Sequence, residues 1–133
     1  MRKRVVITGL GAVTPIGNDV PTFWESLVAG RSGGAPVTAY DASDMDVQIA
    51  AEVKGFDPVE HLDRRLIKRT DRFTQLAIAA ADEAIANSGL DFEQRGDNRD
   101  VGVIVCTGIG AVGTLMENMK VLEKRVPRRV SAL

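Results

Sequence analysis

Residues 101–113 constrain the fold of this chain more strongly than any other stretch. The segment 101–106 is a run of mostly β-branched residues with almost no polar interruption, which is typical of a strand covered on both faces. A glycine-rich turn then leads into a helical pattern over 114–124. Because α/β proteins place their sites where a strand turns into a helix, the stretch predicts both a fold class and a place for function.

The glycines of that turn match the pattern G-x-G-x-x-G through Gly108, Gly110 and Gly113. In a dinucleotide-binding fold this spacing lets the backbone approach a pyrophosphate at a helix N-terminus. Such a fold also needs a second strand ending in an acidic residue, whereas 126–130 is basic and broken by proline. A tight turn with close helix–strand packing is the better explanation of the glycines. A nucleotide-binding module on 108–113 stays open as an alternative that an NAD or ATP titration would test.

Composition bounds the remaining possibilities. The 133 residues are enough for one domain with a core, since 44% are hydrophobic. With 17 basic and 18 acidic residues, the whole chain shows no bias toward nucleic acid or an anionic membrane. The single cysteine cannot form an internal disulfide, and no apolar run reaches the roughly 20 residues that span a bilayer. We therefore expect a protein of the reducing cytoplasm with no membrane segment.

The first half of the chain predicts a strand, a helix and a short strand. A second buried-strand pattern covers 3–9, and glycines follow it. A helix is predicted with Asn18 or Asp19 as its cap, Pro21 in its first turn and Gly30 as its stop, and with Trp24 in the core. The region 31–46 is predicted as a surface loop and 47–53 as a short strand.

The second half carries a basic run and a strong helix. Five basic side chains fall within nine positions of the run 61–72, which predicts either a solvated helix face or a docking patch for an acidic partner. Thr70 or Asp71 is expected to cap a buried central helix over 73–88, whose alanines permit close approach to a sheet or another helix. The segment 91–100 is polar and is expected to connect this helix to the next strand.

No complete catalytic constellation is visible in the sequence. Cys106 is the sole cysteine and lies in a predicted buried strand, where a thiol behaves as a small hydrophobic group. His61 is the sole histidine, and its basic surroundings offer neither a second metal ligand nor a paired acid. Metal-ligand spacings, G-x-S-x-G and a Walker-type lysine loop are also missing. We therefore predict no catalytic residue, metal site or cofactor in this chain.

Several stretches together resemble the β-ketoacyl-acyl carrier protein synthases, most closely the type II elongating enzymes. The resemblance covers essentially the whole chain and is specific as a set, although each piece alone is weak. Its parts are the opening segment 4–18, then Phe23-Trp24-Glu25-Ser26-Leu27 and Gly30-Arg31-Ser32-Gly33, the helix 71–90, and Val101-Gly102-Val103 through Thr107-Gly108-Ile109-Gly110.

The resemblance implies a thiolase-like α/β fold with αβαβα layers, in a homodimer. It implies a decarboxylative Claisen condensation in fatty acid biosynthesis, in which an acyl chain passes to a cysteine and is joined to malonyl-acyl carrier protein. The family's nucleophile and its two catalytic histidines correspond to positions beyond this chain. Residues 1–133 are thus expected to be the first part of the amino-terminal half of a synthase, inactive alone, with no nucleic acid or membrane partner.

Two groups of site residues follow from the resemblance. Ile109 matches the position that gates or lines the acyl-chain pocket, with Val112 and Leu115 as neighbours. An apolar wall suits a fatty chain, which offers area and no hydrogen bonds. The basic surface that receives the acidic carrier protein is matched by six residues, which are Arg64, Arg65, Lys68, Arg69, Arg128 and Arg129. The family has a small residue where Cys106 stands, which favours packing over chemistry there.

Alternatives within the same fold are a polyketide-type ketosynthase and a chain-length partner lacking the nucleophile. A further alternative is a non-catalytic domain that binds acyl carrier protein in a salt-dependent way. That alternative requires the chain to fold by itself. Because the strands at 3–9 and 101–106 are predicted to be covered on both faces, we expect the isolated chain to expose large apolar patches.

Overall fold

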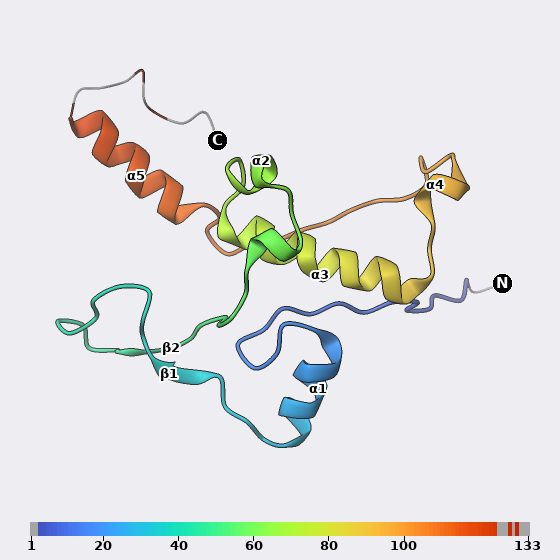
Figure 1. Cartoon of the computed structure of the whole chain (residues 1–133), viewed down its shortest axis with the longest axis horizontal. Coiled ribbons are helices and arrows are strands. Elements are labelled where there is room, and N and C mark those ends of the chain that lie inside the picture. Colours follow the sequence, from blue (N-terminus) through green and yellow to red (C-terminus); the bar gives the residue numbers. More distant parts are fainter. Residues whose placement is uncertain (1–2, 125–127, 129, 131–133) are drawn as a thin grey trace.

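The computed structural model describes residues 3–124, 128 and 130. Figure 1 shows the long helix α3 at the centre, the amino-terminal segment and α1 on one side, and α5 projecting from the end at which α3 begins. The elements in order are α1 (Val20–Val28), β1 (Gly34–Pro36), β2 (Ile49–Ala51), the 3-10 helix η1 (Pro58–Glu60), α2 (Arg64–Ile67), α3 (Arg72–Ser88), α4 (Phe92–Arg95) and α5 (Val112–Glu123).

The helices begin and end at the local signals in the sequence. Asp19 caps α1 by accepting a hydrogen bond from the amide of Thr22 at 2.7 Å. Gly89 ends α3 in the left-handed region, with φ of 70°, where a side chain would be strained. The short helix α4 was not predicted, although Asp91 caps it through two backbone amides, so the segment 91–100 is not a plain connection.

The amino-terminal segment packs directly on α3. A methyl group placed on Gly11 would lie 1.8 Å from the carbonyl oxygen of Ala80, so only hydrogen fits between the two backbones. Glu83 of α3 accepts hydrogen bonds from the amides of Ala12 and Val20, both at 2.8 Å. The alanines of α3 do permit a close approach, but the partner is this segment and not the predicted sheet or helix. One carboxylate holds both the segment and the start of α1.

A short antiparallel hairpin forms the one sheet of the described residues. Ala35 of β1 pairs with Ala50 of β2, and Gly34 with Ala51. The predicted strand over 47–53 is confirmed in shortened form, but β1 lies inside the region 31–46 that was predicted as a loop. Its residues show no alternation of polar and apolar types, so the pairing was not readable from sequence.

Acid should loosen the segment after β1. Hydrogen bonds from the Thr38 side chain and from the Ala39 and Thr38 amides lower the pKa of Glu52 below its ordinary value of 4.5. A lowered pKa means that the carboxylate's contribution is present above pH 4.5 and is lost as pH falls through the folded-state pKa. We expect the NMR shifts of both amides to titrate in that acidic range. In Glu52→Gln this titration should vanish, and its persistence would contradict the assignment.

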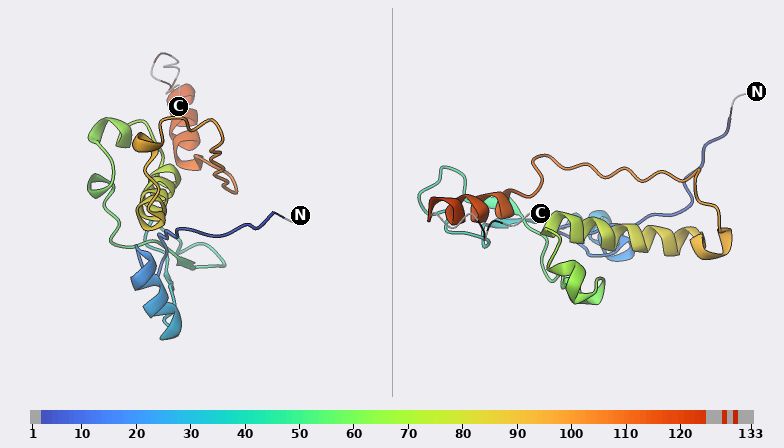
Figure 2. Two further views of the ribbon diagram at one scale, coloured as in Figure 1. Left: turned by 90° about the vertical axis from the view of Figure 1, so that its right-hand side faces the viewer. Right: turned by 90° about the horizontal axis from the view of Figure 1, so that it is seen from above.

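The two strands predicted at 3–9 and 101–106 are not formed. Both segments are extended, but among the described residues neither pairs with another strand. Figure 2 shows the segment between α4 and α5 running free of the sheet. Val5 and Ile104 are each 90% exposed, because extended backbone becomes a covered strand only when neighbouring strands and helices pack on it. The expectation that the chain exposes large apolar patches is confirmed.

The core is accordingly small. Trp24, predicted as a core anchor, is 62% exposed, and Cys106, predicted as buried, is also exposed. Within α3 only Gln75 and Ala79 are fully buried, so that helix is half-buried and not central to a core. The chain exposes 11109 Å² of surface, against about 6,800 Å² for a compact protein of its 14.3 kDa mass. Much apolar surface is therefore available for other packing.

Candidate functional site: a basic turn beside an apolar hollow

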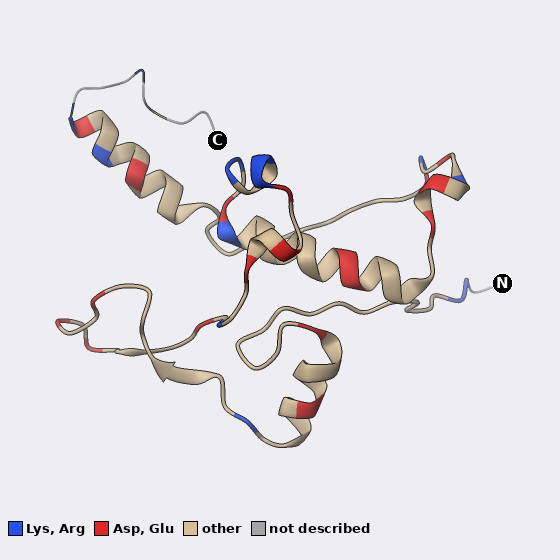
Figure 3. Ribbon diagram, viewed as in Figure 1, with Lys and Arg blue, Asp and Glu red and all other residues tan. Residues whose placement is uncertain are grey.

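The basic turn is built from α2 and the residues that follow it. Asp63 caps α2 by accepting from the amides of Arg65 and Leu66 at 2.7 and 2.9 Å, and Leu62 is buried beneath it. Figure 3 shows the resulting concentration of basic residues around α2 and the start of α3. The exposed side chains are those of Arg64, Arg65, Lys68 and Arg69, and none forms an ion pair within the described part of the chain.

The buried side-chain amide of Gln75 donates hydrogen bonds to the backbone of the basic turn. Gln75 of α3 is 8% exposed, and its Nε2 donates to the carbonyl oxygens of Ile67 and Thr70 at 3.2 and 2.9 Å. These two carbonyls bracket Lys68 and Arg69, so the positions of the two cations are set by α3. Of the other two members of the predicted basic surface, Arg128 is exposed and Arg129 lies outside the described residues.

An apolar hollow of about 270 Å³ lies at the start of α5. It is lined by all three predicted acyl-pocket residues, Ile109, Val112 and Leu115, together with Ala111, Thr114 and Asn118. Gly110, with φ of 81°, makes the turn that places Ile109 beside the helix. These side chains are open to solvent, since Ile109 is 85% exposed. The structure therefore brings the three residues together as one wall of a pocket.

A second hollow of about 450 Å³ joins the basic turn to α5. Lys68 and Arg69 lie on one side of it, and Gly113, Thr114 and Glu117 lie on the other. Thr114 lines both hollows. The hydroxyl of Thr114 also donates a hydrogen bond to the carboxylate of Asp71, so α5 is tied to the end of the basic turn. Sequence reasoning missed Thr114 and Gln75 and expected Asp71 only as a cap.

The glycine turn does not have the form of a nucleotide site. The segment before it is not a strand, and α5 begins at Val112, which places Gly113 inside the helix. A side chain on Gly108 or Gly113 would meet no atom within 4 Å, so the expected close packing of helix on strand is also wrong here. The glycines that do permit close packing are those against α3.

The sole histidine and the acidic side chains form no metal-binding cluster within the described residues. His61 is exposed and stacks on Phe56, with ring centroids 5.3 Å apart. Across residues 3–124, 128 and 130, no cluster of three or more His, Cys, Asp or Glu side chains could hold a metal ion. No helix within those residues is both long enough and apolar enough to cross a membrane.

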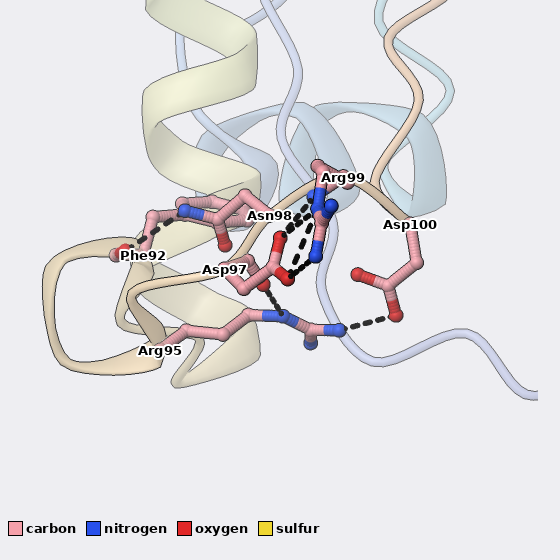
Figure 4. Close-up of polar contacts among 6 residues, drawn as sticks. All are labelled: Phe92, Arg95, Asp97, Asn98, Arg99 and Asp100. Carbon is pink, nitrogen blue, oxygen red and sulfur yellow. Dashed lines mark hydrogen bonds and ion pairs between the residues drawn. The ribbon is translucent and has the colours of Figure 1, made fainter.

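The loop after α4 is a set of surface ion pairs. Figure 4 shows Arg99 on Asp97 and Arg95 on Asp100, each pair at 2.6 Å. The side chain of Arg99, and then its backbone amide, lowers the pKa of Asp97. These four charges are paired within the loop, whereas the Oδ1 of Asn98 is buried with no hydrogen-bond partner among the described residues.

Comparison with known proteins gives a consistent result. The family model described as "Beta-ketoacyl synthase, N-terminal domain" matches residues 2–133. Proteins named 3-oxoacyl-(acyl-carrier-protein) synthase 2 from Coxiella burnetii and a Synechocystis species are 45% and 42% identical over 130 residues. These alignments cover 98% of this chain and 31% of each relative. The chain thus spans about a third of the length of these relatives.

Solved structures agree with the sequence relatives. The ishigamide ketosynthase/chain length factor is similar with a TM-score of 0.78 and 29% identity, over 99% of this chain and 33% of that one. A type II PKS acyl-carrier protein in complex with its ketosynthase gives 0.77 and 26%, over 98% and 33%. The fold is therefore part of the thiolase-like α/β fold of ketosynthases, as predicted.

Proposed function

Because this chain belongs to the beta-ketoacyl synthase family through its N-terminal domain, we propose that it forms the first part of a 3-oxoacyl-(acyl-carrier-protein) synthase of fatty acid biosynthesis. The complete enzyme would join an acyl thioester to malonyl-acyl carrier protein with loss of carbon dioxide. In this proposal the chain contributes binding surfaces, and the cysteine and histidines of catalysis come from outside it. The relatives, of which this chain spans 31%, support that division.

One observation carries the proposal. Thr114 lines both the apolar hollow and the second hollow, and the second hollow is also lined by Lys68 and Arg69 of the basic turn. An acyl carrier substrate needs this combination, since its protein part is acidic and its acyl chain is apolar. Lys68 and Arg69 would receive the acidic carrier, while Ile109, Val112 and Leu115 would line the path of the chain. The complex of a similar ketosynthase with its acyl-carrier protein supports a carrier as partner.

The proposal also assigns the exposed apolar segments. Segments 3–9 and 101–106 are extended, and their side chains are apolar on both faces. We assign both segments as strands that pair with further strands of the complete synthase. In this assignment, residues 1–133 form the first part of the amino-terminal half of that synthase. That enzyme would work as a homodimer in the cytoplasm. Burial of the valines and isoleucines would stabilise it by about 1.5 to 3 kcal/mol for each side chain.

Reversing two charges on the basic turn should selectively weaken the carrier-bound substrate. In the complete synthase, Lys68→Glu with Arg69→Glu is expected to raise KM for malonyl-acyl carrier protein about tenfold, because repulsion replaces attraction at the encounter surface. The effect should shrink as salt is added. Steady-state kinetics with carrier-bound and carrier-free malonyl thioesters measure it, and KM for the carrier-free thioester should not change.

A matched control is available on another surface. Lys54 is exposed and follows β2, so Lys54→Glu reverses one charge away from the basic turn, which is half the charge change of the double variant. Its KM for the carrier substrate should stay within about twofold of the parent. If Lys54→Glu and the double variant raise KM equally, only net charge matters and the docking assignment is wrong.

A polyketide ketosynthase or its chain-length partner is the second candidate, which the similar solved structures support. The named fatty acid relatives are more similar, at 42–45% identity against 26–29%. Product analysis after several rounds of condensation separates the candidates when the other enzymes of each pathway are supplied. Saturated chains would support the main proposal, and chains that keep their ketones would overturn it.

A further inference from the structure

Asp71 occupies a capping position without capping its helix. It precedes α3 in an extended conformation, yet its side chain accepts no hydrogen bond from the amides of that helix. By contrast, Asp19, Asp63 and Asp91 each accept from the first amides of their own helices. An N-cap hydrogen bond stabilises a helix, so directing this carboxylate elsewhere has a local cost.

The carboxylate of Asp71 instead accepts from the hydroxyl of Thr114, which lies 43 residues later in α5. Both residues are half-buried. Asp71 lies at the end of the basic turn. Thr70 immediately precedes it, and the carbonyl oxygen of Thr70 accepts a hydrogen bond from the side chain of Gln75. The far end of the bond is Thr114, which lines both hollows, as Asn118 also does. One hydrogen bond therefore connects the element that carries Lys68 and Arg69 to the wall of the apolar pocket.

We infer that Asp71 and Thr114 are positioning residues that set the carrier-docking turn at a fixed place relative to the acyl pocket. This inference rests on the proposed function. Neither side chain needs to touch substrate. Their bond ensures that a carrier docked on Lys68 and Arg69 presents its acyl chain to the hollow at Ile109, Val112 and Leu115. Without the bond, carrier and chain still bind, but binding of one no longer favours the other.

The test compares substrates with and without the carrier. In the complete synthase, Thr114→Val and Asp71→Ala should each raise KM for an acyl-carrier substrate about fivefold. Asp71 lies outside the lining of the apolar hollow, so Asp71→Ala should leave KM for the carrier-free acyl thioester unchanged. The double variant should be no worse than either single variant, because both remove the same bond. Asp71→Asn keeps an acceptor oxygen and should retain most of the coupling. Thr74→Val is the matched control on α3, where the hydroxyl has no hydrogen bond among the described residues.

A second readout does not depend on the enzyme's activity. Amide hydrogen exchange at Lys68 and Arg69 should be several-fold faster in Thr114→Val than in the parent or in Thr74→Val, since the turn loses its tie to α5. Unchanged exchange overturns the inference, and so do additive KM effects in the double variant. If the parent shows no condensation but the exchange result holds, the proposed function fails while the positioning role of the bond stands. If Asp71→Ala does not fold, Thr114→Val decides both readouts.

Discussion

Replacing Gly11 with alanine is expected to lower the free energy of unfolding by about 3 kcal/mol or more. The added methyl group would lie 1.8 Å from the carbonyl oxygen of Ala80 and 2.8 Å from the amide nitrogen of Ala84. Both neighbours are backbone atoms of α3, so they cannot move aside as a flexible side chain can. The amino-terminal segment would have to lift from the helix. Chemical denaturation of the purified protein measures the loss.

The matched control is Gly113→Ala on α5. A methyl group there meets no atom within 4 Å, and alanine is a better helix former than glycine. This variant should be unchanged or stabilised by up to about 1 kcal/mol. If Gly11→Ala were as stable as Gly113→Ala, the segment could not lie on α3 as the structure shows it.

Removing the Glu83 side chain is expected to destabilise the protein by about 2 to 3 kcal/mol. Its two oxygens accept from the amides of Ala12 and Val20, at 2.8 Å each, and all these groups are partly buried. A carboxylate that accepts from backbone amides forms charge-assisted bonds, and both donors lose their partner in Glu83→Ala. The amino-terminal segment and the start of α1 should separate from α3 together. Denaturation and amide exchange at both residues measure the two effects.

Two further variants locate the cause of this loss. Glu83→Gln keeps one acceptor oxygen and should lose about half as much stability as Glu83→Ala. Asp82→Ala removes an exposed carboxylate from the adjacent position of α3 and should change stability by less than about 0.5 kcal/mol. Equal losses in Asp82→Ala and Glu83→Ala would show that helix charge is responsible and not the two hydrogen bonds.

The sequence predicted the residues that form the candidate site, but not the residues that hold them in position. Ile109, Val112 and Leu115 do line one hollow, and Lys68 and Arg69 do lie on one exposed turn. Those residues were found because the family resemblance carries them position by position. That these residues serve acyl chain and carrier stays a proposal. Gln75 was missed because a glutamine at a helix position gives no sign that its amide will be buried.

The elements that the sequence by itself determined are those whose signals are local. Helix α1 begins at Asp19, and α3 ends at Gly89, because a capping carboxylate and a left-handed glycine act within one turn of the chain. The same local reasoning predicted α5 to within two residues at its start. Hydrogen bonds between near neighbours are enough to specify such boundaries.

Contacts between distant residues were decided only by the tertiary structure. The apolar run 101–106 has the composition of a buried strand, yet it lies exposed, because pairing and coverage require partners that the described residues do not provide. Asp71 has the sequence signature of a cap, yet its carboxylate binds Thr114, 43 residues away. In both cases the outcome depends on which groups the fold brings close together, and no pattern along the chain records that proximity.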